Sequence, residues 1–354
     1  MKKISLFLGM LSICCWASAY WVPSGDANFW SEGVMDITHD NEAVYLIKGE
    51  TLMAVDKNTG GVSVYEGLSH PRSLFMHGDT LLIGCEKEVA FLHEGQLGTY
   101  LEFPEALEAI LSMAFDSKGV FYATSYYDLF RYDGSQRTTV QILSPIFDDY
   151  NCQIRVDGED GVWLSNFSQH VRQGLQRYTS EEGLVSDFGV SVGFGLALDP
   201  IGRVWVGCIG KLVCLDGDAV TTYSVDANLV DMEFDSEGTL WGISDSNTSS
   251  LQRTLWSFHD GTFTSHPCDI GSERWVSLDI DGDAIYVGTV GRLLKYQAGQ
   301  YTEVDLTEVS TSFDPVTMSN RSKASQPSVY DLQGRRLRAR PSHGVYIQDG
   351  KKMR

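Results

Sequence analysis

Beyond its first 19 residues, the sequence has no apolar run that approaches the ~18 residues needed to cross a membrane as a helix. It also has few basic residues outside its last segment. Residues 20–320 carry a net charge of −29, against −20 for the whole chain of 354 residues. A body of this charge repels phosphate backbones, so we expect no nucleic-acid partner. No Cys and His spacing is typical of a zinc site, and we predict no metal and no cofactor.

The first 19 residues are typical of a secretory signal peptide. Lys2 and Lys3 supply the positive charge, residues 4–16 the apolar stretch, and residues 17–19 the small side chains that precede cleavage. We therefore expect a mature chain that begins at Tyr20. Its predicted location is outside the cell or at the outer-membrane surface, with the periplasm as the alternative.

Five cysteines follow the signal segment, so at least one thiol lacks an intrachain partner. They are Cys85, Cys152, Cys208, Cys214 and Cys268. Cys208 and Cys214 flank a turn at Gly210, and one hypothesis pairs them across a hairpin. We favour five small buried thiols, because free cysteine is among the most buried residue types.

A motif with a period near 40 residues runs along the chain. Its first half is an acidic residue, a turn with glycine, and a strand that carries Trp or Tyr, as in Asp157-Gly-Glu-Asp-Gly161-Val-Trp163. Its second half is another strand pair, as in Leu129–Gly134 followed by Thr138–Ile142. Seven copies are centred near Tyr45, Leu82, Tyr122, Trp163, Trp205, Trp241 and Tyr286.

Four short strands per ~40 residues are typical of a β-propeller blade. The predicted fold is therefore all-β, a seven-bladed β-propeller with four-stranded blades over residues 20–308. We expect each repeated Trp and Tyr to pack between blades, since aromatic side chains bury large areas. We expect each repeated Asp and Gly to form a turn.

One copy also indicates a family. It reads Gly183-Leu-Val-Ser-Asp, then Leu198-Asp-Pro-Ile-Gly-Arg-Val-Trp-Val-Gly207 and Lys211-Leu-Val-Cys-Leu-Asp-Gly217. This pattern resembles the propeller repeats of two-component regulator sensors, in which an extracellular propeller precedes a membrane helix and a kinase. This sequence shows neither of those parts. The resemblance therefore implies the fold of residues 34–306 and does not imply signalling.

The repeat stops after Leu306. Residues 309–327 are rich in Ser and Thr without periodicity and are predicted to be a linker. Residues 328–354 contain Val329-Tyr-Asp-Leu-Gln-Gly-Arg-Arg336 and Gly344-Val-Tyr-Ile-Gln-Asp-Gly-Lys-Lys352, which predict a short β-hairpin. This tail is similar to the end of type IX secretion sorting domains, which implies recognition by that machinery. The alternative is a solvated basic tail.

Two patterns that are typical of enzymes and calcium sites have simpler explanations. Gly189-Val-Ser-Val-Gly193 matches a nucleophile elbow, but a strand follows where a helix is needed, so we predict no catalytic Ser191. Asp157–Gly161 and Asp279–Asp283 match fragments of calcium loops but lack the distal Glu. Both lie where the repeat has its turn, and turn chemistry accounts for them.

The candidate binding residues lie where the repeat is interrupted. Propellers bind ligands where the loops between blades, and between the middle strands of each blade, gather on one face. The candidates on these loops are His70, Arg72, Tyr126, Tyr127, Phe147, Tyr150, His170, Arg274 and Trp275. Aromatic rings with scattered polar groups suit a glycan or a peptide, with Arg72, His170 and Arg274 as polar anchors.

The predicted function is a secreted, non-catalytic propeller that binds carbohydrate or peptide at the cell surface. One alternative is a propeller enzyme with an axial site, either a lyase or a polysaccharide-active protein. The streptogramin lyases, a similar-looking class, use His and Glu near the axis, but their motif has no residue-by-residue match here. A compact His and Glu cluster on the axial face would favour the enzyme, and an aromatic-lined face without one would favour binding. The other alternative is a scaffold for protein assembly at the surface.

Overall fold

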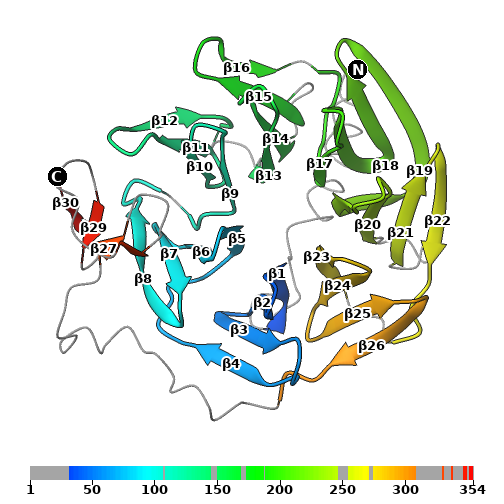
Figure 1. The fold of residues 1–354 in the computed structure, drawn as a ribbon. Helices are drawn as coiled ribbons and strands as arrows, with labels where there is room; N and C mark the ends of the chain where they lie inside the picture. Colours follow the sequence, from blue (N-terminus) through cyan, green and yellow to red (C-terminus); the bar gives the residue numbers. More distant parts are fainter. Residues whose placement is uncertain are drawn as a thin grey trace, which may run out of the picture.

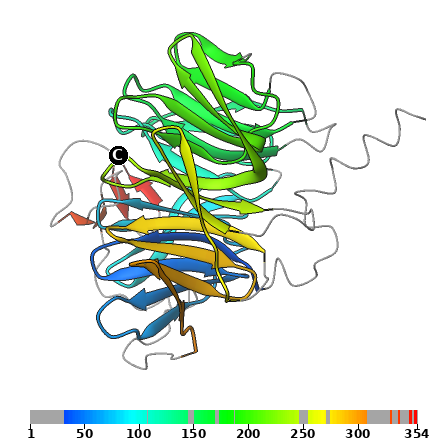
Figure 2. The same cartoon turned by 90° about the vertical axis from the view of Figure 1, so that its right-hand side faces the viewer.

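The computed structural model describes residues 32–106, 108–144, 150–168, 173–186, 188–245, 254–270 and 274–307, and four short segments of the tail at 329–330, 336–337, 346–348 and 351–353. Antiparallel sheets stand in a ring around a central opening, with the first strand of each sheet nearest the centre (Figure 1). Seen from the side, the sheets lie one beside another like blades (Figure 2). The predicted all-β propeller is confirmed.

Five sheets of the ring have four strands each. The first two contain β1 Val34–His39, β2 Ala43–Lys48, β3 Thr51–Asp56 and β4 Val62–Tyr65, then β5 Ser73–His77, β6 Thr80–Cys85, β7 Glu88–His93 and β8 Gln96–Glu102. The next two contain β9 Ser112–Phe115, β10 Phe121–Thr124, β11 Asp128–Tyr132 and β12 Arg137–Gln141, then β13 Tyr150–Val156, β14 Val162–Phe167, β15 Leu175–Thr179 and β16 Gly183–Ser186. The last contains β23 Trp275–Asp281, β24 Ala284–Thr289, β25 Leu293–Gln297 and β26 Gln300–Val304.

The remaining sheet of the ring has six strands in chain order. They are β17 Leu196–Leu198, β18 Val204–Asp216, β19 Ala219–Phe234, β20 Leu240–Asp245, β21 Thr254–His259 and β22 Thr262–His266. β18 and β19 are the longest strands of the ring, at 13 and 16 residues.

The prediction of seven separate four-stranded blades is wrong, because the described strands form six sheets in the ring. The copies of the repeat centred near Trp205 and Trp241 are joined in this one sheet through β18 and β19. The expected turn at Gly210, whose φ is 68°, is an irregularity inside β18 and does not end the strand. Beside it Ile209 pairs with Asn228, and Asn228 pairs with Asp245 on β20. Backbone pairing therefore continues from one copy of the repeat into the next.

The tail also differs from its prediction. Its described residues form a small four-stranded sheet in the order β28-β27-β29-β30, where a two-stranded hairpin was expected. The strands are β27 Val329–Tyr330, β28 Arg336–Leu337, β29 Tyr346–Gln348 and β30 Lys351–Met353. The predicted linker at 309–327 lies outside the described residues.

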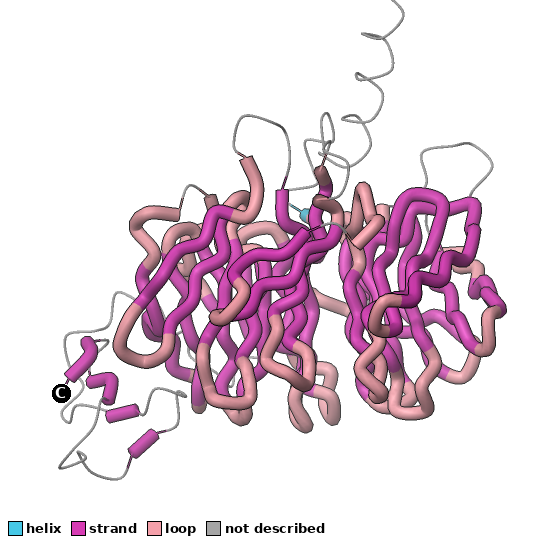
Figure 3. The backbone as a smooth tube through the Cα atoms, turned by 90° about the horizontal axis from the view of Figure 1, so that it is seen from above, coloured by secondary structure: helices cyan, strands magenta, loops and turns pink. Residues whose placement is uncertain are grey.

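Each repeated Asp holds its turn with one oxygen and an aromatic ring with the other. Asp235 Oδ1 accepts hydrogen bonds from the backbone N–H groups of Glu237 and Thr239, and Oδ2 accepts one of 2.8 Å from Trp241 Nε1. The same arrangement recurs at Asp157 with Trp163, at Asp199 with Trp205, and, with a tyrosine hydroxyl, at Asp116 with Tyr122. The interpretation of these Asp and aromatic residues as turn and packing residues is confirmed. Seen from above, loops and turns join the ends of the strands on both edges of the ring (Figure 3).

The five cysteines in the described part of the chain are free, as favoured from the sequence. Cys85, Cys208 and Cys214 are buried, whereas Cys152 and Cys268 are partly buried. Cys208 and Cys214 pack in two different core clusters, so the hypothesis of a disulfide between them is wrong. Burial raises the pKa of Cys208 to about 12, which keeps this thiol protonated.

Side chains of the innermost strands fasten each sheet to the next. Four of these side chains accept a hydrogen bond from a backbone N–H of the next sheet: Asp36 Oδ2 from Leu74 at 2.7 Å, Ser112 Oγ from Ile154 at 3.1 Å, Gln153 Oε1 from Leu196 at 2.8 Å and Asp231 Oδ2 from Leu278 at 2.9 Å. Two serine hydroxyls donate to a carbonyl instead: Ser73 Oγ to Ile110 at 2.8 Å and Ser277 Oγ to Val34 at 2.8 Å. The last of these closes the ring, because β1 and β23 belong to its first and last sheets.

Bulges give four of these side chains their direction. In β1, β13, β19 and β23 the register shifts immediately before Asp36, Gln153, Asp231 and Ser277. A bulge re-aims the side chain that follows it. The irregularity therefore turns a residue of the innermost strand toward its neighbouring sheet.

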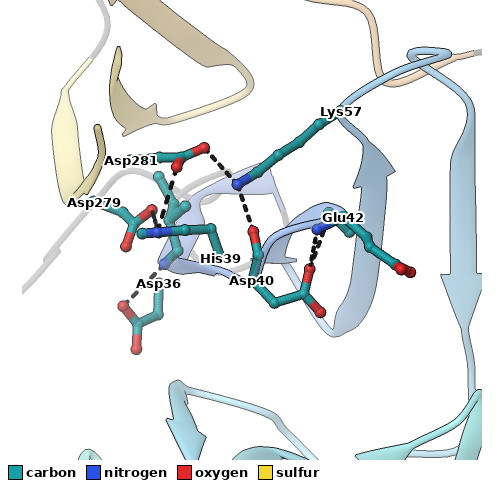
Figure 4. A network of polar contacts seen from close by, with 9 residues as sticks. Asp36, His39, Asp40, Glu42, Lys57, Asp279 and Asp281 are labelled. Carbon is teal, nitrogen blue, oxygen red and sulfur yellow. Dashed lines mark hydrogen bonds and ion pairs between the residues drawn. The ribbon is translucent and has the colours of Figure 1, made fainter. Parts of the chain in front are cut away.

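A polar network joins the first and last sheets beside the closing hydrogen bond (Figure 4). His39 Nδ1 lies 2.8 Å from Asp279 Oδ2, and His39 Nε2 lies 3.5 Å from Asp281 Oδ1. Lys57 Nζ forms an ion pair of 2.5 Å with Asp281 and also donates to the carbonyl of Asp40. The hydrogen bond to Asp279 is the main reason that the pKa of His39 is raised.

Loss of one turn carboxylate should destabilise the protein measurably. In Asp235→Ala the N–H groups of Glu237 and Thr239 and the indole of Trp241 lose their acceptor. We expect the free energy of unfolding to fall by about 1–3 kcal/mol in urea denaturation. Asp218→Ala, at an exposed turn, is the control and should change it by less than ~0.5 kcal/mol. Equal effects of the two variants would contradict the role of Asp235.

Stability should fall as the pH rises from about 5.5 to 8.5. His39 has a raised folded pKa, so its contribution is complete below the ordinary value of 6.5 and is lost as the pH passes the folded value. Burial raises the pKa of Asp36 to about 7, so the folded chain keeps a proton that the unfolded chain has released. This difference also makes stability fall as the pH rises. Urea midpoints measured across this range should decrease, and less steeply in His39→Gln. A midpoint that rises with pH would refute the assignment.

Candidate binding site at the central channel

The centre of the ring holds a cavity of about 520 Å³. Its walls are the innermost strands β1, β5, β9, β13, β19 and β23, and Arg72, which directly precedes β5, also lines it. A concave space lined by a few polar groups is the usual form of a ligand site. The cavity is therefore the candidate functional site, and we call its Arg72 end the channel mouth.

Four carboxyl groups and two guanidinium groups line the channel, among them Asp279 on β23 and Arg72 before β5. Asp36 belongs to β1, Asp231 and Glu233 to β19, and Arg155 to β13. Gln153, also on β13, donates from Nε2 to Asp231 Oδ1 at 2.6 Å. The bulges that fasten the ring thus also place Asp36, Gln153 and Asp231 on the channel wall.

The channel walls change the acidity of these groups. Burial raises the pKa of Asp36 to about 7, and the negative charge of Asp231 acts in the same direction. Burial also raises the pKa of Asp231. Enclosure raises the pKa of Glu233 to about 7, with a further contribution from Asp279, although water in the channel still reaches this side chain. Removal of a carboxylate from bulk water favours its neutral form.

Two of the predicted residues lie together at the channel mouth. Arg72 donates from Nη1 to the carbonyl of Pro71 at 2.8 Å, and burial lowers its pKa. Tyr126 is close enough for the Arg72 charge to lower its pKa, although burial raises that pKa overall. The Tyr126 ring packs against Phe167 and Phe194 and remains half-exposed. A cation and an aromatic ring are therefore neighbours here, with Arg72 on the cavity wall and Tyr126 outside the set of residues that line it.

His70 lies on the same loop as Arg72, between two glutamates. Its Nε2 is 3.2 Å from Glu50 Oε1, and its Nδ1 is 3.2 Å from Glu86 Oε2. The residue is 53% exposed. Its φ of 47° is uncommon for a residue other than glycine. This is a compact group of His and Glu, but its members do not line the central cavity, whereas the enzyme alternative calls for such a group on the axial face.

A buried amide network supports the loop that carries Tyr126. Thr124 Oγ1 donates to Asn151 Oδ1 at 2.7 Å, Asn151 Nδ2 to Asn166 Oδ1 at 3.0 Å, and Asn166 Nδ2 to Gln176 Oε1 at 2.9 Å. These four side chains are at most 1% exposed. Asn151 N also donates to the carbonyl of Tyr126 at 2.9 Å. Since buried polar groups need partners, this chain fixes the loop.

The other predicted site residues have different positions. Tyr127 packs against the core cluster between β10 and β14, with its ring centroid 6.1 Å from that of Tyr126. Trp275 is 3% exposed and packs against Tyr301, so it belongs to the core and its prediction as a binding residue is not supported by its position. Arg274 is half-buried, and its carbonyl accepts from Val290 N.

Three predictions fall on residues whose side chains are not described. Phe147 and His170 lie outside the described residues, and Tyr150 begins β13, where it pairs with Phe167. Ser191 lies in a loop that leads into β17, without a helix in the described structure around it. The nucleophile-elbow context is therefore not found there.

The sequence analysis missed the polar residues of the channel wall. Asp36, Gln153 and Asp231 occupy the position of the first strand where other copies of the repeat have Ser73, Ser112, Ser277 or Gly195. A comparison of the copies at this one position would have found them. Arg155 and Glu233 follow two residues later on the same strands.

No protein-family model matches the sequence, and the search of curated proteins found no match. Among the described residues, none forms a helix long and apolar enough to span a membrane.

Solved structures share the fold. The chain is similar to virginiamycin B lyase from Staphylococcus aureus, with a TM-score of 0.60 and 14% identity over 73% of this chain and 94% of that one. It is similar to the WD40 propeller domain of Doa1, with a TM-score of 0.61 and 14% identity over 79% and 95%. For the extracellular domain of a putative hybrid two component system from B. thetaiotaomicron, the TM-score is 0.49, with 15% identity over 76% and 46%. At these identities the first two show the β-propeller fold alone.

Proposed function

We propose that the protein is a non-catalytic ligand-binding propeller that recognises a glycan or a peptide at the channel mouth. The cavity of about 520 Å³ with Arg72 on its wall is the observation that carries this proposal. A guanidinium binds carboxylate or carbonyl oxygens, and the face of a tyrosine supports a sugar ring or an apolar side chain. Arg72 and Tyr126 supply both contacts in one place.

We also propose that this recognition occurs outside the cytoplasm. The signal-peptide pattern of residues 1–19 supports that location, and the similarity of residues 328–354 to sorting domains supports export by type IX secretion. An alternative use of the same fold, as a scaffold with protein partners only, would not require the polar cavity.

Thermal shift with glycan and peptide panels tests the binding proposal. A ligand at 100 times its Kd stabilises the folded protein by about 2.7 kcal/mol, so a true ligand raises Tm clearly. We expect Arg72→Ala and Tyr126→Ala each to reduce affinity at least about tenfold, since each removes one contact with the ligand.

Lys118→Ala is the matched control, because Lys118 is 74% exposed on the turn between β9 and β10, pairs with Asp160 and does not line the cavity. It should leave affinity unchanged. A panel in which no glycan or peptide shifts Tm, or a ligand whose affinity all three variants lower equally, would sink the proposal.

A second candidate function is an enzyme in which His70 transfers a proton. The contacts of His70 with Glu50 and Glu86 favour it, because a carboxylate beside an imidazole orients the ring. The strained φ of His70 is a further feature that clusters at functional sites.

Quinupristin distinguishes the two candidates. A structure of a catalytically inactive variant of the staphylococcal lyase contains this compound. The enzyme candidate predicts a new product by liquid chromatography and mass spectrometry with the wild-type protein and none with His70→Ala. The binding proposal predicts unchanged quinupristin in both samples, and turnover that depends on His70 would replace it.

A further inference from the structure

The charges around the channel are unevenly placed. Asp231 and Glu233 on β19, Asp279 on β23 and Asp36 on β1 come from three consecutive innermost strands. Arg155 comes from β13, which lies across the central opening from β1 and β23 in Figure 1. The channel therefore has an acidic wall with four carboxyl groups, and two guanidinium groups also line it, Arg155 on β13 and Arg72 at the mouth.

The hydrogen bonds to three of these carboxyl groups come from neutral donors. Asp36 accepts from two backbone N–H groups, and Asp231 accepts from two backbone N–H groups and the amide of Gln153. Glu233 accepts from the backbone N–H of Ile280. In the described part of the chain no ion pair joins Asp36, Asp231 or Glu233 to a basic side chain. Asp279, by contrast, is paired with His39.

Arg155 does not neutralise this wall by contact. It donates from Nη1 to the carbonyl of Ile154 at 2.8 Å, and its charge lowers the pKa of Asp36, Asp231 and Glu233 only as a secondary effect behind burial. Buried charges in proteins are usually paired, because removal from water costs several kcal/mol per ion. Asp36 and Asp231 are partly buried, and water reaches Glu233. When all three are ionised, their charge exceeds that of the two guanidinium groups that line the same cavity, Arg155 and Arg72.

We propose that the channel binds the ammonium or guanidinium group of its ligand between Asp36, Asp231 and Glu233. The ligand is then an amine-bearing peptide, and a neutral glycan is excluded from the deep part of the site. This inference rests on the proposed function, in which the peptide lies over the mouth with its carbonyl or carboxylate oxygens near Arg72. Arg72 at the mouth is positive, whereas the carboxyl groups in the deep part of the site are negative. This difference fixes the direction in which the peptide enters.

The assignment has a defined pH dependence. Asp36 and Glu233, whose pKa values burial raises to about 7, bind a cation only when ionised. Asp231 and Asp279 face them with like charge, and Arg155 and Arg72 line the same cavity with opposite charge. Asp36, Asp231 and Glu233 therefore titrate as a coupled set. Binding of a cation should therefore strengthen as the pH rises from about 6 to about 8.

Isothermal titration calorimetry with 1,5-diaminopentane tests the proposal on the full protein. This probe stays protonated near pH 6 and near pH 8, as a lysine side chain does. We expect it to bind, more tightly near pH 8, and we expect 1,5-pentanediol of the same length not to bind. Equal affinities for diamine and diol, or no diamine binding near pH 8, would overturn the proposal.

A pair of variants identifies the site. Glu233→Gln should weaken diamine binding about tenfold, the loss expected for one charge-assisted hydrogen bond. Glu237→Gln, at the exposed turn that follows β19, is the matched control and should bind as the wild type does. Urea denaturation of both variants establishes that each is folded. Equal affinity of the two variants would place any diamine binding outside the channel and refute the assignment.

The failure of this inference is distinguishable from that of the proposed function. If a neutral glycan binds in a manner that depends on Arg72 and the diamine does not bind, the mouth is a site and the cation assignment is wrong. If the diamine binds through Glu233 and no peptide or glycan binds at the mouth, the cation site is supported and the proposed function fails.

Discussion

The ring depends on hydrogen bonds that side chains of the innermost strands make to the backbone of the next sheet. Each antiparallel sheet pairs its backbone N–H and C=O groups within itself, so backbone hydrogen bonds alone do not join it to the next sheet. Six hydrogen bonds from residues such as Asp36, Ser112 and Ser277 supply the connection. Apolar packing between the sheets buries surface but is not directional. Between the two fused copies of the repeat, the continuous strands β18 and β19 take over this task.

The same positions create the channel. A side chain that reaches from an innermost strand toward the next sheet must pass beside the central opening, so the polar groups that fasten the ring also line the cavity. Ser and Gln can do this as neutral groups. Asp36 and Asp231 do it with carboxyl groups whose pKa burial raises, which costs stability at neutral pH. Residues that weaken a fold in this way are common where a protein binds its ligand.

The periodic part of the structure was accessible from the sequence, and the exceptions were not. The turn Asp and the Trp six residues later, as at Asp235 and Trp241, predict a hairpin because both roles recur in register. The sequence around Gly210 predicts another turn in the same way. Only the pairing of Ile209 with Asn228 in the structure shows that the strand continues. Sequence alone therefore gave the fold class and an incorrect number of blades.

The candidate site, like the fold, was predicted from the sequence only in part. Arg72 and Tyr126 interrupt the repeat, and both lie at the channel mouth. Trp275 also looked like an interruption, but a bulge sets it at the start of β23, where it packs on Tyr301. The channel carboxyl groups were hidden inside the repeat, because they occupy a strand position that is elsewhere a small neutral residue.

Hydrogen–deuterium exchange with and without bound trilysine tests most directly whether recognition occurs at the channel. The acidic turns between strands offer this probe a competing surface, as at residues 157–160 and 235–237. Our account predicts slower exchange in residues 34–38, 72–76 and 230–234, which form the channel wall and mouth. Slower exchange confined to the acidic turns, with the channel strands unchanged, would contradict it.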